Sequence, residues 1–411
     1  VVAGGFFVQA DLLWSGAARH HCVKMALTPT CVSPFPSATR CGLLQRLHLL
    51  AALGLVSPLA IGCGSGDDAE AQGNPHASLD LPVDQRGPYQ AGYARYETTY
   101  TPDGETEPRT IVVHVWYPTE ETSGEHPKYL DFFDGLYSFE GASLAPPLEK
   151  AGYPVHVYSH GDRGWGGTSD ELMSYYASHG WVAVAPDHTG NTFNGNLDPR
   201  PTATYIARPQ DISQSLDFVA NLPASDPLAG KLQLDRVVMS GHSFGTYTTW
   251  AIAGADYDVD SIRAECPSAE GVCTEAELGA FATGFRDPRI VGGIPMAGGD
   301  SSSWFGDLDT AEIPIFLMSA SGDPVGADTL YAEVKSLDLT WIEIAGGCHQ
   351  LFALGGCPDV ERQVGYAIVD TYALAFGRHL VLGDDSEATL NILDGTTNVS
   401  DLVTFQRKNA Q

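Results

Sequence analysis

Positive charge is scarce in this chain. Its 411 residues include 22 lysines and arginines against 51 aspartates and glutamates, which gives a formal net charge of −29 at pH 7. So acidic a surface repels both the nucleic acid backbone and anionic lipid headgroups, and we expect neither as a partner. Charged residues make up only 18% of the chain while hydrophobic residues reach 43%, which is typical of a folded globular protein and excludes a disordered one.

A hydrophobic run long enough for a comfortable membrane span is also missing. The apolar run 47–61 follows Arg40 and Arg46 and is shorter than a transmembrane helix requires. It is typical of a secretory signal and ends in Leu59-Ala-Ile-Gly-Cys63, which resembles the lipobox of bacterial lipoproteins. We therefore expect residues 1–62 to be upstream sequence and signal peptide. The exported protein would be a cell-envelope lipoprotein, held to the membrane only by a lipid on Cys63, or a secreted protein.

Cysteines are few beyond this leader. Besides three in the leader and Cys63, the chain has only Cys266, Cys273, Cys348 and Cys357. Their pairwise spacing favours Cys266–Cys273 and Cys348–Cys357 disulfides, although four cysteines allow three connectivities. Neither pair has the C-x-x-C spacing that zinc sites favour, so disulfides of an exported protein are the preferred interpretation.

The remaining chain alternates between strand and helix patterns. Residues 63–85 are small, polar and acidic and predict a flexible tether, and residues 383–411 form a C-terminal tail of unclear role. Between them, the range 86–382 predicts one catalytic domain with a mostly parallel, doubly wound sheet, and 256–285 an insertion above that sheet. An antiparallel N-terminal hairpin is expected at one edge, and helices at 169–179, 209–221 and 361–380. The expected strands are 93–101, 110–117, 153–158, 181–185, 290–296, 313–318 and 341–344.

A strand, tight turn and helix surround Ser243. The apolar residues 237–239 stop at Gly-His-Ser-Phe-Gly, 241–245, after which small and β-branched residues predict a helix. Gly241 and Gly245 allow close approach of strand and helix, so that the serine hydroxyl is raised at the sheet end beside a helix N-terminus. This pattern predicts a nucleophilic serine.

A nucleophilic serine needs an imidazole base and a carboxylate that orients it. His349 follows the predicted strand 341–344 and lies after Ser243 in the chain, which is the order of base and nucleophile in α/β-hydrolases. Asp323, in the turn after the strand ending at Met318, is the leading acid; Asp300 is second and Asp328 third. An oxyanion would be stabilised by the backbone N–H groups of Phe244 and of Asp162, in the loop after Tyr158. The candidate walls of the substrate pocket are Trp165, Phe244 and Trp304.

Five motifs occur together in one order. They are His160-Gly161 after the strand at 153–158, Ala185-Pro-Asp-His-Thr-Gly-Asn191, Arg208-Pro-Gln-Asp211, Gly-His-Ser-Phe-Gly and His349-Gln-Leu-Phe352. Over about 86–380 the chain thus resembles platelet-activating-factor acetylhydrolases and dienelactone-hydrolase-like esterases and, more distantly, cutinase-type polyester hydrolases. The resemblance implies the α/β-hydrolase fold and a serine esterase with Ser243, Asp323 and His349 as its triad and Phe244 and Asp162 as oxyanion donors.

The chain departs from these relatives in two places. The acetylhydrolases usually have an apolar residue where Asp162 stands, so its carboxylate is expected to point away or to pair with Arg163. Their acid follows the strand matching 290–296, whereas Asp323 fits the polyester-hydrolase pattern. True dienelactone hydrolases use a cysteine nucleophile, so Ser243 argues against that activity.

The sequence as a whole predicts a monomeric serine carboxylic ester hydrolase that forms an acyl-enzyme on Ser243. Short-acyl or aromatic esters are the expected substrates, with a polyester or an acetylated phospholipid as alternatives. A peptidase, an acyltransferase or a surface binding protein without catalysis could use the same scaffold. No metal or organic cofactor is expected, and the expected partner is a small-molecule or polymeric ester.

Overall fold

The structure is a computed structural model that describes residues 77–198, 200–266, 273–298 and 304–410. These residues belong to one compact unit, which extends over 69–411. The predicted signal peptide, Cys63, most of the predicted tether and Asp300 lie outside the described residues.

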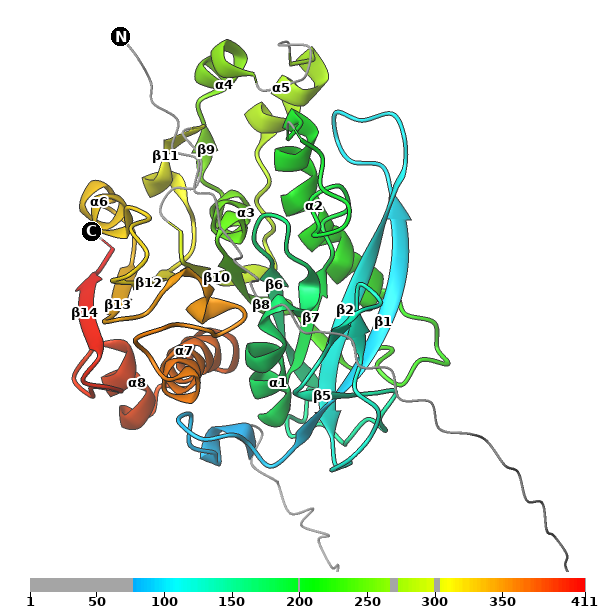
Figure 1. Cartoon of the computed structure of the whole chain (residues 1–411), viewed down its shortest axis with the longest axis vertical. Coiled ribbons are helices and arrows are strands. Elements are labelled where there is room, and N and C mark those ends of the chain that lie inside the picture. Colours follow the sequence, from blue (N-terminus) through cyan, green and yellow to red (C-terminus); the bar gives the residue numbers. More distant parts are fainter. Residues whose placement is uncertain (1–76, 199, 267–272, 299–303, 411) are drawn as a thin grey trace, which may run out of the picture. The chain divides into compact units, whose positions relative to one another are not determined.

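A ten-stranded sheet runs through this unit in the order β14-β13-β12-β10-β8-β6-β7-β2-β1-β5 (Figure 1). The six strands from β7 to β13 are mutually parallel, which confirms the predicted mostly parallel sheet. The strands are β1 (Gln90–Tyr100), β2 (Arg109–Thr119), β5 (Ser138–Glu140), β6 (Tyr153–Ser159), β7 (Val182–Pro186), β8 (Leu232–His242), β10 (Ile290–Met296), β12 (Ile315–Ala320), β13 (Leu339–Ile344) and β14 (Val403–Lys408).

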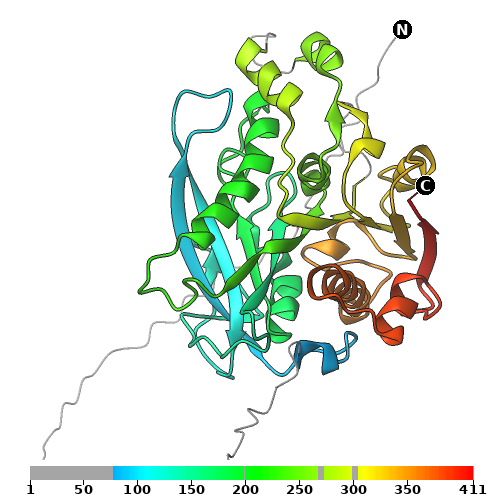
Figure 2. The ribbon, with the colours of Figure 1, turned by 180° about the vertical axis from the view of Figure 1, so that it is seen from behind.

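Helices cover both faces of the sheet, as expected for a doubly wound fold (Figure 2). The helices are α1 (Asp170–Ser178), α2 (Thr202–Ala220), α3 (Phe244–Ala253), α6 (Ala327–Glu333), α7 (Arg362–Gly377) and α8 (Glu387–Leu393). Strand residues alternate between two cores because side chains of a strand point to opposite faces. In β6, Val155 and Val157 join the core that includes α2 and α3, whereas His156 stacks on Tyr176 of α1 with ring centroids 4.2 Å apart. The buried sheet fixes the strand ends that carry the site.

The predicted N-terminal hairpin is present. β1 and β2 pair antiparallel along their whole length, from Gln90 opposite Thr119 to Tyr100 opposite Arg109. The short strand β5 then pairs with β1 in parallel, so the hairpin lies one strand inside the edge.

Helix α2 begins at Thr202, so the predicted start at Pro209 was wrong. Proline lacks the N–H that would bond to the carbonyl four residues earlier, and it is therefore normally read as a helix start. Here the hydroxyl of Tyr247 on α3 donates to that carbonyl, Tyr205 O, at 3.0 Å. A side chain from another helix thus satisfies the acceptor that Pro209 leaves open.

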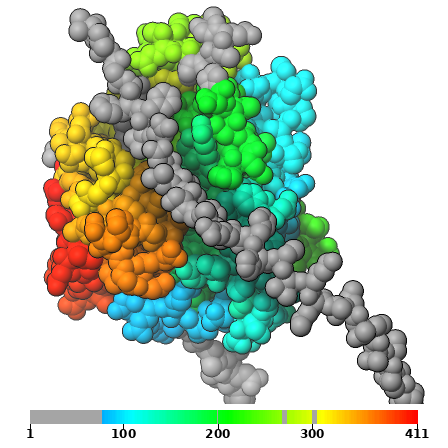
Figure 3. All heavy atoms as spheres, in the orientation of Figure 1, coloured from blue at the N-terminus to red at the C-terminus, as the bar shows by residue number. Residues whose placement is uncertain are grey.

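The folded unit extends beyond the expected range 86–382 at both ends. At its start, the guanidinium of buried Arg378 donates to the carbonyls of Leu79 (2.8 Å) and Leu81 (2.6 Å), which fixes residues expected in the tether. At its end, α8 packs against α7, and β14 pairs antiparallel with β13 from Lys408 opposite Leu339 to Val403 opposite Ile344. Figure 3 shows this C-terminal segment in red beside α7 in orange. The presumed tail is therefore an edge of the sheet.

The insertion predicted at 256–285 holds α4 (Val259–Glu265), α5 (Glu275–Thr283) and β9 (Asp256–Tyr257), which pairs with β11 (Phe305–Asp307). These helices lie at the upper end of Figure 1. A Cys266–Cys273 disulfide joins the end of α4 to the residue before the N-cap of α5, Thr274, with the Cα atoms 5.5 Å apart. None of the helices within the described ranges combines the length and hydrophobicity that a membrane span requires.

Candidate active site

Ser243 lies in a strained turn between β8 and α3. Its φ of 55° and ψ of −116° place it in a region of backbone conformation that residues other than glycine seldom adopt. The neighbouring glycines make the turn possible: a Cβ on Gly241 would lie 2.1 Å from Gly245 O, and a Cβ on Gly245 would lie 2.1 Å from Ser159 O. The strand, the helix and the end of β6 meet at van der Waals distance, and the Ser243 N–H is fixed to Met296 O of β10 at 2.9 Å.

The structure brings Asp323 and His349 together. His349 Nδ1 lies 2.7 Å from Asp323 Oδ2, and the acid is more buried than the base, with 9% of its side chain exposed against 37%. The two loops are joined by hydrogen bonds from Gly322 N–H to Gly347 O (2.9 Å) and from Gly346 N–H to Ser321 Oγ (2.9 Å). The predicted Cys348–Cys357 disulfide is also present beside His349.

His242 connects this pair to the Ser243 turn. Burial, and next the charge of His349, lower the pKa of His242 to about 4, so its ring is neutral near pH 7. Its Nε2–H donates to the carbonyl of His349 at 2.8 Å, which holds the base at the end of β8. Ser243, His349 and Asp323 therefore gather at the carboxyl ends of β8, β13 and β12, where the sequence placed them. Asp328, by contrast, is exposed in the first turn of α6.

The loop after β6 lies against Ser243, since a Cβ on Gly161 would come within 3.0 Å of Ser243 Cβ. The carbonyl of Gly161 accepts hydrogen bonds from His160 Nδ1–H (2.7 Å) and from Gly164 N–H (3.1 Å). A trans peptide directs its C=O and N–H groups in opposite directions. These two bonds therefore point the Asp162 N–H away from Gly164 and fix its direction.

The carboxylate of Asp162 has partners other than the expected one. Its Oδ1 accepts from Asn191 Nδ2 and Arg200 Nη2, both at 2.6 Å, while Arg163 Nε lies 3.7 Å from Oδ2. Burial raises the pKa of Asp162, but the Asn191 hydrogen bond and the charge of Arg200 outweigh burial and hold the pKa below its usual value. The negative charge is thus compensated beside the site by Arg200 as well as by Arg163, the partner that the sequence predicted.

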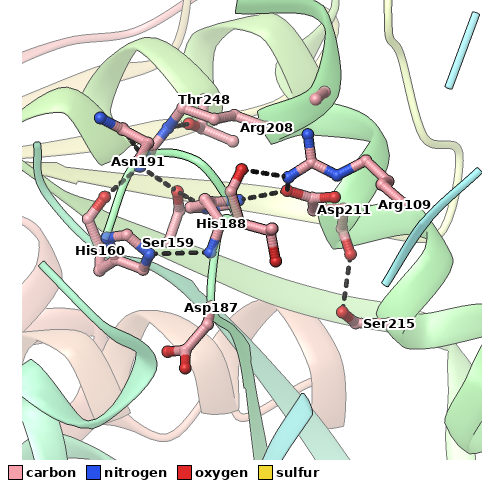
Figure 4. A network of polar contacts seen from close by, with 12 residues as sticks. Arg109, Ser159, His160, Asp187, His188, Asn191, Arg208, Asp211, Ser215 and Thr248 are labelled. Atoms are coloured by element: carbon pink, nitrogen blue, oxygen red, sulfur yellow. Dashed lines mark hydrogen bonds and ion pairs between the residues drawn. The ribbon is translucent and has the colours of Figure 1, made fainter. Parts of the chain in front are cut away.

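Beneath this loop lies a fully buried polar network centred on Arg208 (Figure 4). Its guanidinium donates to Ser159 Oγ (3.1 Å), to Asn191 Oδ1 (2.7 Å), to Thr248 Oγ1 (3.1 Å) and to the carbonyl of His160. This guanidinium lies 4.5 Å from the centroid of the Phe244 ring, and that of Arg200 lies 4.1 Å from the same centroid. The network therefore supports the Asp162 loop and the start of α3 together.

A second serine, histidine and aspartate occur within this network. Ser159 Oγ lies 2.9 Å from His188 Nε2, and His188 Nδ1 lies 2.9 Å from Asp211 Oδ2. All three side chains are inaccessible to solvent, so no substrate reaches them. The main-chain N–H of His188 donates to Nε2 of His160 at 3.0 Å, which leaves the proton of that ring on Nδ1, facing Gly161 O. Several of these residues belong to the motifs of the sequence, but no role was predicted for them.

A cavity of about 400 Å³ opens beside Ser243. Its walls include Trp165, one of the predicted pocket residues, and also Phe133 and Phe193, which the sequence did not single out. Trp165 stacks on Phe133 with ring centroids 4.1 Å apart. Trp304 is not among the lining residues; it is buried under the insertion, 4.2 Å from the ring of Tyr205, and the prediction that it lines this pocket was wrong.

Within the described part of the chain, no three histidine, cysteine, aspartate or glutamate side chains are grouped so that they could hold a metal ion. The chemistry available at this site is that of a serine hydroxyl, an imidazole–carboxylate pair and fixed backbone N–H groups.

Comparisons with known proteins agree with this architecture. Residues 141–263, which include β6, the Asp162 loop, α2 and the Ser243 turn, match the chlorophyllase family. Among solved structures, the chain is similar to a ferulic acid esterase from Streptomyces cinnamoneus, with 17% identity, 80% of this chain and 98% of that chain covered, and a TM-score of 0.54. No curated protein sequence matches the chain. The chain has the α/β-hydrolase fold, and the two comparisons taken together point to a carboxylic ester hydrolase.

Proposed function

We propose that the protein is a serine carboxylic ester hydrolase that acts through an acyl-enzyme on Ser243. The observation that carries the proposal is the His349–Asp323 hydrogen bond of 2.7 Å at the sheet end where Ser243 occupies its strained turn. A strained serine at a strand-to-helix turn, with an oriented imidazole after a later strand, is the arrangement of α/β-hydrolases.

In the proposed reaction, neutral His349 removes the proton of Ser243 as the hydroxyl oxygen attacks the ester carbonyl. Asp323 holds the ring in the tautomer with its proton on Nδ1 and stabilises the imidazolium that forms. The N–H groups of Phe244 and Asp162 stabilise the oxyanion. His349 then protonates the leaving alcohol, and a water molecule activated by the same ring releases the acid.

Short-acyl or aromatic esters are the proposed substrates. The cavity of about 400 Å³ lies near the small end of the usual range for ligand pockets, and the aromatic rings of Trp165, Phe133 and Phe193 line it. One similar structure is that of a protein named as a ferulic acid esterase, which favours an aromatic acid ester. A polyester or an acetylated phospholipid would use the same groups and remains the alternative.

We further propose that the protein acts outside the cytoplasm as a monomer. Two disulfides are consistent with export to an oxidising environment. The apolar run 47–61 and the lipobox-like residues before Cys63 support a signal peptide followed by lipidation or secretion.

The test is hydrolysis of p-nitrophenyl acetate, together with labelling by a fluorophosphonate. Ser243→Ala should lose hydrolysis and labelling while its circular dichroism spectrum stays unchanged, and Ser336→Ala, at an exposed serine, should keep both. Retained turnover by Ser243→Ala would refute the nucleophile. If the fluorophosphonate did not label the wild-type protein, a binding protein without catalysis would be favoured.

A further inference from the structure

A second hollow adjoins the cavity beside Ser243. We call the cavity lined by Ser243, His242 and Phe193 the catalytic chamber, and the hollow of about 270 Å³ lined by Leu136, Tyr137 and Tyr366 the side chamber. Five residues line both chambers: Phe133, Trp165, Thr168, Ala353 and Leu354. The two chambers therefore meet at a common wall.

The shared wall is firmly held. Phe133 lies on the small hairpin of β3 (Lys128–Tyr129) and β4 (Phe133–Asp134), whose turn residues Leu130 and Asp131 have φ angles of 49° and 66°. Two consecutive residues at positive φ make the tight turn that matches the twist of a hairpin. Phe133 then stacks almost parallel on buried Trp165, at an interplanar angle of 5°. The stack forms a rigid apolar divider along which a substrate chain could lie.

Exposed apolar side chains concentrate around the chambers. Among the described residues, seven large hydrophobic side chains are exposed, and four of them lie here: Phe132 (51%), Leu136 (62%), Phe193 (57%) and Leu354 (50%). Phe132 contacts Phe133, with ring centroids 4.2 Å apart, and Phe193, at 5.9 Å. Apolar side chains scattered singly over a surface need no explanation, but a group around one opening marks a binding site.

Two acidic side chains that line the side chamber, Asp170 and Glu171, have partners within the protein. Asp170 accepts from Trp116 Nε1 (2.8 Å), Tyr129 OH (2.8 Å) and the N–H of Leu136 (2.9 Å). Glu171 is paired with Arg86 at 2.5 Å. A polar ligand that binds Asp170 would have to compete with these contacts, whereas an apolar ligand would leave them intact.

We propose that the side chamber is a second substrate subsite, which binds an apolar chain of the ester too long for the catalytic chamber. The chain would pass over Leu354, which is half exposed and lines both chambers. The inference rests on the proposed function for the position of the ester carbonyl at Ser243, and it extends the substrate class to esters that carry a long apolar chain on the acyl or the alcohol side. With both chambers filled, the site falls well within the usual volume range of ligand pockets.

Two ester series test the subsite and identify which side of the ester enters it. One is p-nitrophenyl esters from acetate to octanoate, and the other is alkyl acetates from ethyl to octyl, all below their micelle concentrations. Each additional buried methylene should raise kcat/KM by about fourfold. We expect one of the series to rise at least tenfold between the four-carbon and eight-carbon chains. A rise confined to the first series places the acyl chain in the side chamber, and a rise confined to the second places the alcohol there.

Leu136→Asp is the decisive variant, because Leu136 lines only the side chamber and is mostly exposed, so its replacement should not disturb folding. It should lower the eight-carbon to four-carbon ratio of kcat/KM at least fivefold. Leu390→Asp, at an exposed leucine of α8, is the matched control and should leave the ratio unchanged. The subsite would be overturned if kcat/KM varied less than threefold with chain length in both series. It would also be overturned if Leu136→Asp left the eight-carbon to four-carbon ratio of kcat/KM unchanged.

The affinity of the same esters for Ser243→Ala, measured by calorimetry, separates this inference from the proposed function. If affinity increases with chain length and this increase is lost in Ser243→Ala combined with Leu136→Asp, the subsite stands even where no ester is hydrolysed. Absence of hydrolysis by the wild type would then count against the proposed reaction alone. Affinity that does not change with chain length would overturn the subsite whether or not the protein is an esterase.

Discussion

Replacing Arg208 by methionine should weaken both the fold and catalysis. Methionine fills much of the same volume, but it removes the donors to Ser159 Oγ, Asn191 Oδ1, Thr248 Oγ1 and the carbonyl of His160. These acceptors are buried, so water cannot replace the guanidinium. The Asp162 loop would lose its support from below.

The magnitude follows from two opposing contributions. Each buried acceptor left unsatisfied costs about 1–3 kcal/mol, so four together cost about 8 kcal/mol. Burial, and next the charge of Arg200, lower the pKa of Arg208 to about 9, which means that keeping this guanidinium charged in the folded chain costs about 5 kcal/mol. The substitution removes that cost. The unfolding free energy should therefore fall by about 3 kcal/mol.

Urea unfolding followed by circular dichroism measures this change, with an unchanged m-value as a check on two-state behaviour. The kcat for p-nitrophenyl acetate should fall at least tenfold with little change in KM, and Arg208→Lys should restore part of it. Arg95→Met is the control, since Arg95 and Glu97 form an exposed pair at 3.4 Å, and its effect should stay below about 1 kcal/mol. The reasoning is refuted if Arg208→Met costs no more than Arg95→Met and kcat is unaffected.

Three further predictions concern the triad, the tight turn and pH. Asp323→Asn should lower kcat about 10³- to 10⁴-fold with little change in KM, because an amide cannot hold His349 in the required tautomer. If steady-state kinetics show no loss of kcat, another carboxylate orients the base. Gly245→Ala should lower the melting temperature sharply, because its Cβ would lie 2.1 Å from a carbonyl oxygen. Gly279→Ala in α5 should raise the melting temperature slightly, because its Cβ would meet no atom within 4 Å. Similar melting temperatures of the two variants would contradict the packing around Gly245. Burial lowers the pKa of five histidines, to about 3 for His156 and His160, to about 4 for His179 and His242, and well below the usual value for His188. Since these rings stay neutral when folded but take up protons when unfolded, the unfolding free energy should rise from pH 5 to pH 6.5. Burial raises the pKa of two carboxyls, which oppose this rise: Asp211 and Asp370. Urea titrations at both pH values should show a net increase of about 3 kcal/mol or more, and no increase would contradict the burial of neutral rings.

The fold and the central residues of the site could be predicted because their signals are local. Apolar runs such as 181–185 are typical of strands buried on both faces, and β7 occupies that place. Parallel strands present their carboxyl ends at one side of the sheet, so the chain order alone brought Ser243, Asp323 and His349 to one region.

The support of the site could not be predicted because it consists of contacts between distant segments. Arg208 touches residues near 159, 191 and 248, and no periodicity records which buried donor will face which acceptor. The carboxylate of Asp162 pairs with the distant Arg200 in addition to its expected neighbour Arg163. The hairpin that presents Phe133 has strands of only two residues each, too short for any alternating pattern.

The edge strand β14 determines where this chain can be shortened. A protein cut at residue 382, the end expected from the sequence, would lose the partner of β13 and leave its backbone N–H and C=O groups unpaired along Leu339–Ile344. Four of the six residues of β13 are apolar, and an uncovered strand of this kind readily pairs with a second molecule. β14 itself ends in Arg407 and Lys408, whose charges oppose such pairing at the natural edge. β14 thus covers a strand that would otherwise favour aggregation.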